Sequence, residues 1–123
     1  MSDVLIEPGG TGDGRRVTDR HPVVGWIRRE VVPRLVESFA PQQVIVFDPP
    51  GRPADVDRKA PGLLVVSTRF EGVAVAERVA RVGAVLGSIT PVRPLCLTPG
   101  EARLAGSVPG PVYAAVRSGV RVL

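Results

Sequence analysis

The chain has 123 residues, of which 44% are hydrophobic, and a formal net charge of +4; these values suit one domain with a modest core. Because it has only three Phe, one Tyr and one Trp, that core is expected to consist mainly of Val, Leu, Ala and Ile. No apolar run is long enough to cross a bilayer and no signal-peptide pattern is present, so the sequence predicts a cytoplasmic protein with no membrane partner.

The N-terminal part divides into a tail and a helix. Residues 1–22 are rich in glycine and carry scattered charges, which is the composition of a flexible tail, so one structured domain is expected over residues 23–123. From Val23 to Phe39 apolar residues recur at three- and four-residue steps, which predicts an amphipathic helix. Pro33 cannot donate a backbone hydrogen bond, so this helix is expected to kink or restart there.

Two short apolar runs, Val44–Phe47 and Leu63–Val66, are typical of strands buried on both faces. The segment between them is rich in proline and charge, which excludes a continuous helix. Residues 71–86 predict a second helix and Val92–Leu97 a third strand. A strand, a helix and a strand joined in this way are expected to place the two strands parallel, provided that they are neighbours.

The last third of the chain begins with the strand that contains Cys96, the single cysteine. Cys96 is expected to be a packed hydrophobe, and alone it excludes an internal disulfide. Thr98–Glu101 is a capping box and predicts a short helix to about Ala105. Another short helix over Pro109–Ser118 and a terminal strand over Val120–Leu123 follow. These elements predict the α/β (α+β) class, with a small mixed sheet flanked by helices.

The stretch from Gln42 to Val66 resembles the minimal nucleotidyltransferase domains related to DNA polymerase β. Their signature has a strand ending in Phe, then G-S-x-A-R-G, and later S-D-x-D-L-L-V-V on the next strand. Phe47, Arg52 and Leu63–Val66 match that spacing without a gap. The resemblance extends from about Val23 to the C-terminus and implies the polymerase-β-like fold.

The same resemblance implies that catalysis has been lost. In the family the Gly-Ser pair holds the triphosphate, and three carboxylates hold the catalytic metals. The corresponding positions here are degenerate, namely Asp48, Pro49, Ala60, Gly62 and Arg93. Since Mg²⁺ requires hard oxygen ligands, the resemblance implies a protein with no catalytic residues, no metal site and no cofactor.

We therefore interpret the chain as a degenerate nucleotidyltransferase, a pseudoenzyme that acts as a partner-binding or regulatory module, for instance an antitoxin-like protein or an assembly subunit. A protein partner or a second copy of the chain is expected. The candidate partner-binding residues are apolar or aromatic, as interface cores are: Trp26, Tyr113, Val120, Val122 and Leu123.

Two alternatives stay open. Asp55 and Asp57, together with Asp48, could replace the missing ligands and give an active Mg²⁺-dependent nucleotidyltransferase. Arg52 and Arg93 could instead bind the phosphates of a nucleotide or a nucleic acid without metal, which the basic balance of the chain suits. The side chains that line the hollow expected at the carboxyl ends of the first two strands would decide between these interpretations.

Overall fold

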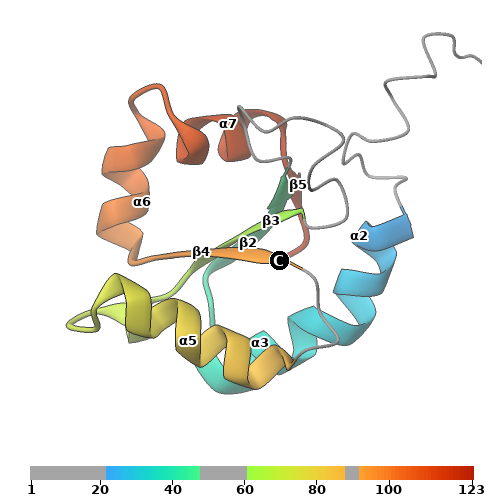
Figure 1. The fold of residues 1–123 in the computed structure, drawn as a ribbon. Helices are drawn as coiled ribbons and strands as arrows, with labels where there is room; N and C mark the ends of the chain where they lie inside the picture. Colours follow the sequence, from blue (N-terminus) through green and yellow to red (C-terminus); the bar gives the residue numbers. More distant parts are fainter. Residues whose placement is uncertain (1–21, 48–60, 88–91) are drawn as a thin grey trace, which may run out of the picture.

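The computed structural model describes residues 22–47, 61–87 and 92–123, which form three layers, with helices on both sides of one β-sheet (Figure 1). This is the small mixed α/β arrangement that the sequence predicts. Among the helices in these ranges, none combines the length and apolarity that crossing a bilayer requires. In chain order the elements are α2 (Pro22–Trp26), η1 (Ile27–Val31), α3 (Val32–Phe39), β2 (Gln43–Phe47), β3 (Gly62–Val66), η2 (Thr68–Phe70), α5 (Val75–Leu86), β4 (Arg93–Leu97), α6 (Pro99–Gly106), α7 (Pro111–Ser118) and β5 (Val120–Arg121).

The N-terminal helix is divided by a π-helical turn. In this turn the backbone N–H of Val32 donates to the carbonyl of Ile27, one residue further back than in an α-helix. The turn ends at Val31, two residues before Pro33, whose ring nitrogen has no hydrogen to donate, and the helix restarts as α3. The restart expected at this proline is therefore present.

The four strands lie in the order β4, β3, β2, β5. β2 is antiparallel to both of its neighbours, β3 and β5, whereas β3 and β4 are parallel. β3 and β4 are neighbours, so the condition for a parallel pair is met, and the pair belongs to a mixed sheet. Because β2 and β3 are antiparallel, their carboxyl ends lie at opposite ends of the sheet.

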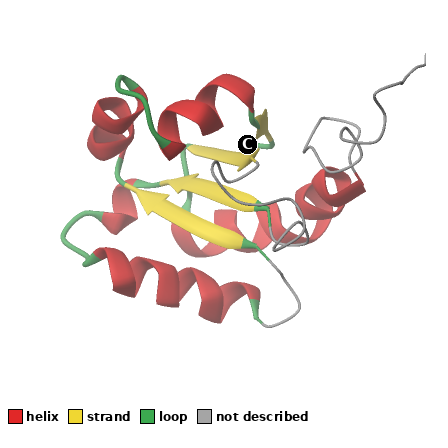
Figure 2. Cartoon of the chain, turned by 45° about the horizontal axis from the view of Figure 1, so that its top comes forward, coloured by secondary structure: helices red, strands yellow, loops and turns green. Residues whose placement is uncertain are grey.

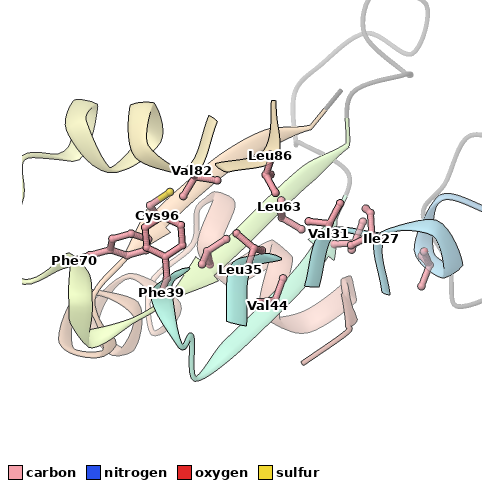
Figure 3. Close-up of a cluster of buried hydrophobic side chains, with 13 residues drawn as sticks. Ile27, Val31, Leu35, Phe39, Val44, Leu63, Phe70, Val82, Leu86 and Cys96 are labelled. Atoms are coloured by element: carbon pink, nitrogen blue, oxygen red, sulfur yellow. The ribbon is translucent and has the colours of Figure 1, made fainter. Parts of the chain in front are cut away.

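One side of the sheet, here called the α3–α5 face, carries the larger core (Figure 3). Helices α2, η1, α3 and α5 pack against it, and the Phe39 and Phe70 rings meet there with their centroids 5.3 Å apart. The buried residues of this cluster are Val24, Ile27, Val31, Leu35, Phe39, Val44, Val46, Leu63, Val65, Phe70, Val82, Leu86 and Cys96.

The other side, the α6–α7 face, is covered by helices α6 and α7 (Figure 2). Its buried residues are Ile45, Phe47, Leu64, Val66, Val112 and Ala115. Of these, only Val112 and Ala115 come from the helices. Ala102 and Ala105 of α6 are partly buried and pack against the same cluster. Small side chains therefore cover this face, and its core is the smaller of the two.

Candidate interaction surface

Of the positions expected to bind metal or nucleotide, Gly62 and Arg93 lie in the part of the chain that the structure describes, and the sheet brings these two together. Gly62 and Arg93 are register partners in the parallel pair of β3 and β4, and the Arg93 side chain is exposed. The hollow expected at the carboxyl ends of β2 and β3 does not form, because those ends lie apart. The positions outside the described residues are Asp48, Pro49, Arg52, Asp55, Asp57 and Ala60.

Gly62 has a packing role that the sequence comparison did not reveal. Phe47 is its cross-strand partner in β2. A Cβ added at Gly62 would lie 2.4 Å from the Cζ atom of the Phe47 ring, so this ring occupies the space of a side chain. The glycine at this position is therefore explained by aromatic packing.

Three of the five candidate partner-binding residues contribute to the protein's own core. Trp26, Val120 and Val122 are partly buried and pack against the cluster on the α3–α5 face. Leu123 is more exposed, and its carbonyl accepts a hydrogen bond from the Val44 N–H at 3.1 Å, which extends the pairing of β5 with β2.

Tyr113, the fifth candidate, lies on the other side of the sheet, on helix α7. The Arg117 guanidinium lies over its ring, 5.3 Å from the centroid, and donates to the Tyr113 hydroxyl at 3.1 Å. The five candidates thus lie on two sides of the sheet and do not form one surface.

Arg78 of helix α5, which the sequence analysis did not single out, is a buried arginine with 5% exposure. Its Nε donates to the Val73 carbonyl at 2.7 Å, and its Nη1 donates to the Cys96 carbonyl at 3.2 Å. The two terminal nitrogens also bond both carboxylate oxygens of Glu101, at 2.5 and 3.2 Å. One side chain therefore connects the start of α5, the end of β4 and the first turn of α6.

The capping box at the start of α6 is part of this network. The Thr98 N–H donates to Glu101 Oε1 at 3.0 Å, and the Glu101 N–H donates to the Thr98 hydroxyl at 3.2 Å. The hydrogen bond from Arg78, and then that from Thr98, lowers the pKa of Glu101 from 4.5 to about 2. The carboxylate is therefore ionised at neutral pH and forms an ion pair with Arg78.

This network is structural and offers no reactive group. Burial raises the pKa of the Cys96 thiol from 9.0 to about 11, and the side chain is fully buried, so it stays a protonated, packed hydrophobe as expected. Among the described residues, no group of three or more His, Cys, Asp or Glu side chains could hold a metal ion.

The free edge of β4 is poorly suited to pairing with another strand. The Arg93 N–H donates to the Pro61 carbonyl, and the Leu97 carbonyl accepts from the Ser67 N–H, so the backbone groups of Arg93 and Leu97 point toward β3. The backbone groups of Pro94 and Cys96 therefore point toward the open edge. Pro94 has no N–H, and the Cys96 carbonyl already accepts from Arg78.

Exposed aliphatic side chains concentrate on the outer helical layer. We call the segment 99–118, which comprises α6, α7 and their connection, the α6–α7 layer. Six large hydrophobic residues are exposed in the described part of the chain, and three of them belong to this layer: Leu104 (75%), Val108 (54%) and Val116 (50%).

The charged side chains on the α6–α7 side of the molecule are mostly positive. Residues 92–123 contain four arginines, Arg93, Arg103, Arg117 and Arg121, all exposed, but a single carboxylate, Glu101. Glu101 is paired with the buried Arg78, so this carboxylate does not neutralise Arg103, Arg117 or Arg121. The α6–α7 layer therefore presents aliphatic side chains together with arginines, and it is the candidate interaction surface.

Comparisons with known proteins give one finding. No family model and no curated protein matches this chain. Among solved structures, a crystal structure described as a bol-like protein from Babesia bovis is similar, with 26% sequence identity and a TM-score of 0.47 over 64% of this chain and 92% of that one.

That neighbour is BolA-like and is not a nucleotidyltransferase, so the family resemblance drawn from the sequence is wrong. The polymerase-β-like fold that this resemblance implied is corrected with it. The physical reason lies in what was matched: Phe47 and Leu63–Val66 form a buried antiparallel strand pair, in which the Phe47 ring covers Gly62. Any such pair with a connection of the same length produces the same pattern.

Proposed function

We propose that this protein is a protein-binding module and that its docking surface is the α6–α7 layer. Scattered exposed hydrophobic residues are ordinary on any protein surface. Their concentration supports the proposal, because half of the exposed large hydrophobic residues in the described part lie between Leu104 and Val116.

Docking through side chains is favoured over strand addition. A partner strand that joins a sheet needs a row of free backbone N–H and carbonyl groups. The β4 edge offers few, because of Pro94 and the hydrogen bond from Arg78 to the Cys96 carbonyl. The strand at the other edge, β5, has only two residues. The helical layer is the larger surface for a partner.

Site-specific photo-crosslinking in the host cell tests this function. A photoreactive amino acid is placed at Leu104, which is 75% exposed, and in a second variant at Val75, which is 56% exposed on α5 across the sheet. We expect a covalent adduct with one defined protein from position 104 and none from position 75. The adduct is identified by mass spectrometry, and the complex is then rebuilt from purified components.

The outcomes separate the alternatives clearly. An adduct between two copies of this chain would identify the partner as a second copy on the same surface. Equal adducts from Leu104 and Val75, or none from Leu104, Val108 and Val116, would refute the α6–α7 layer as the docking surface.

A further inference from the structure

The charge of the α6–α7 side indicates the chemistry of what binds there. On the α3–α5 side, exposed arginines are accompanied by exposed glutamates, as in the pair between Arg81 and Glu77 at 2.6 Å. On the α6–α7 side, the one acidic side chain among the described residues 92–123, Glu101, is held by Arg78. We infer that the segment that docks on the α6–α7 layer is an acidic peptide segment with aliphatic side chains; this inference rests on the proposed function.

Two of the arginines are held in place before any partner arrives. The Arg117 guanidinium is fixed over the Tyr113 ring and donates to its hydroxyl. The Arg121 Nε donates to the Leu123 carbonyl at 2.9 Å. A cation whose side chain is already ordered loses less conformational entropy when it binds a carboxylate. Arg103 of α6 is exposed and adds a third cation beside Leu104.

The aromatic residues argue against a nucleic acid as the occupant. Proteins that bind single strands stack bases on exposed aromatic rings. Here the three Phe rings, Phe39, Phe47 and Phe70, are buried, and Trp26 packs on the core of the α3–α5 face. The Tyr113 ring is covered by Arg117. What remains exposed beside the arginines is aliphatic, which suits Leu, Ile or Val side chains of a peptide.

The test uses a fluorescent peptide of about 15 residues, made of Leu and Glu with leucines at three- and four-residue steps. Three controls accompany it: the same peptide with Lys for Glu, the same peptide with Ser for Leu, and a single-stranded oligonucleotide of similar charge. Binding to the full chain is measured by fluorescence anisotropy at low and at physiological salt. We expect saturable binding of the Leu-Glu peptide alone, weakened by salt.

Matched variants locate the binding. The double variant Arg103→Ala/Arg117→Ala is expected to raise the Kd of the Leu-Glu peptide by roughly 5- to 10-fold. Leu104→Ser is expected to raise it about 5-fold. The control Arg29→Ala/Arg34→Ala removes two exposed arginines across the sheet and should leave the Kd within about twofold.

Several results would overturn the inference. These are equal binding of the Lys-containing peptide, equal binding of the oligonucleotide, a Kd unchanged in Arg103→Ala/Arg117→Ala, or no saturable binding at about 1 mM peptide. A crosslinked partner at Leu104 combined with any of these results would leave the proposed function standing and refute the acidic segment alone. Failure of the crosslink would refute the proposed function itself.

Discussion

The two faces of the sheet differ in the side chains that cover them. On the α3–α5 face, helices contribute large residues such as Leu35, Phe39 and Leu86, whereas on the α6–α7 face they contribute Val112 and Ala115. The second layer is instead attached by the polar network of Arg78 and Glu101. Stability is therefore concentrated on one side of the sheet, and the other side keeps a layer whose exposed surface is available for binding.

Adjacent residues of β3 provide the sharpest test of this difference. Leu63 faces the α3–α5 side and Leu64 the α6–α7 side, and both are fully buried. We expect Leu63→Ala to lower the free energy of unfolding by about 3–4 kcal/mol and Leu64→Ala by about 2–3 kcal/mol. The loss is larger for Leu63→Ala because the cavity left by this substitution is surrounded by larger side chains. Urea denaturation measures both; equal losses would contradict the comparison.

Because Gly62 contacts the Phe47 ring, a larger side chain at position 62 should disturb the core of the α6–α7 face. Gly62→Ala is expected to lower the free energy of unfolding by about 1–3 kcal/mol, because the new Cβ displaces the Phe47 ring. Gly83→Ala in helix α5 is the matched control, since nothing lies within 4 Å of a Cβ there. It should gain about 0.5–1 kcal/mol from helix propensity. A neutral Gly62→Ala in thermal or urea unfolding would remove this packing explanation.

The ion pair that attaches α6 should appear in the pH dependence of stability. The folded-state pKa of Glu101 lies near 2, below its ordinary 4.5, so its contribution is complete above about pH 4.5 and is lost as the pH falls toward 2. Glu101→Gln should abolish that dependence and lower the free energy of unfolding at neutral pH by about 1.5–3 kcal/mol, because Arg78 stays buried without its counter-charge.

The exposed pair of Glu77 and Arg81 supplies the control for this experiment. Glu77→Gln should change the free energy of unfolding by less than about 0.5 kcal/mol, since both side chains are about half exposed. Similar losses for Glu77→Gln and Glu101→Gln in urea titrations across this pH range would show that the Glu101 pair has no special structural role.

The smallest effects on stability are expected at the proposed docking surface. Leu104→Ser and Val108→Ser should change the free energy of unfolding by no more than about 0.5 kcal/mol, because both side chains are exposed. Thermal unfolding of the isolated protein measures this. A loss above about 1 kcal/mol would mean that these residues support the fold and are not kept exposed for a partner.

The sequence predicted well what depends on neighbours along the chain. The capping box of Thr98 and Glu101 is present because its hydrogen bonds span three residues. The apolar runs became β2 and β3, and the break near Pro33 is present. Local physics determines each of these features, so a pattern of residues is enough to identify it.

Features that depend on distant residues were missed. Arg78 joins Val73, Cys96 and Glu101, and no spacing in the sequence indicates that these meet. One signal was present, because Arg78 lies on the stripe with Val82 and Leu86 that is buried in α5, whereas Val75 is 56% exposed. An arginine on the apolar stripe of a helix calls for a buried carboxylate or carbonyl partner.

The candidate surface was equally hard to predict. Val112 and Val116 lie four residues apart on α7, yet Val112 is buried and Val116 is 50% exposed. A helix of eight residues completes little more than two turns, so its apolar stripe does not define which flank meets the sheet. Trp26, Val120 and Val122 were chosen for their apolar character, and the fold uses that character in its own core.

The blunted edge of β4 has a consequence for the behaviour of the protein at high concentration. An open strand edge such as that of Arg93–Leu97 is a template on which a strand of another molecule can pair. Pro94 interrupts that ladder, and the guanidinium of Arg78 occupies the acceptor that an incoming chain would need. The same arginine that attaches α6 thus also removes one acceptor from the edge at which two molecules could join their sheets.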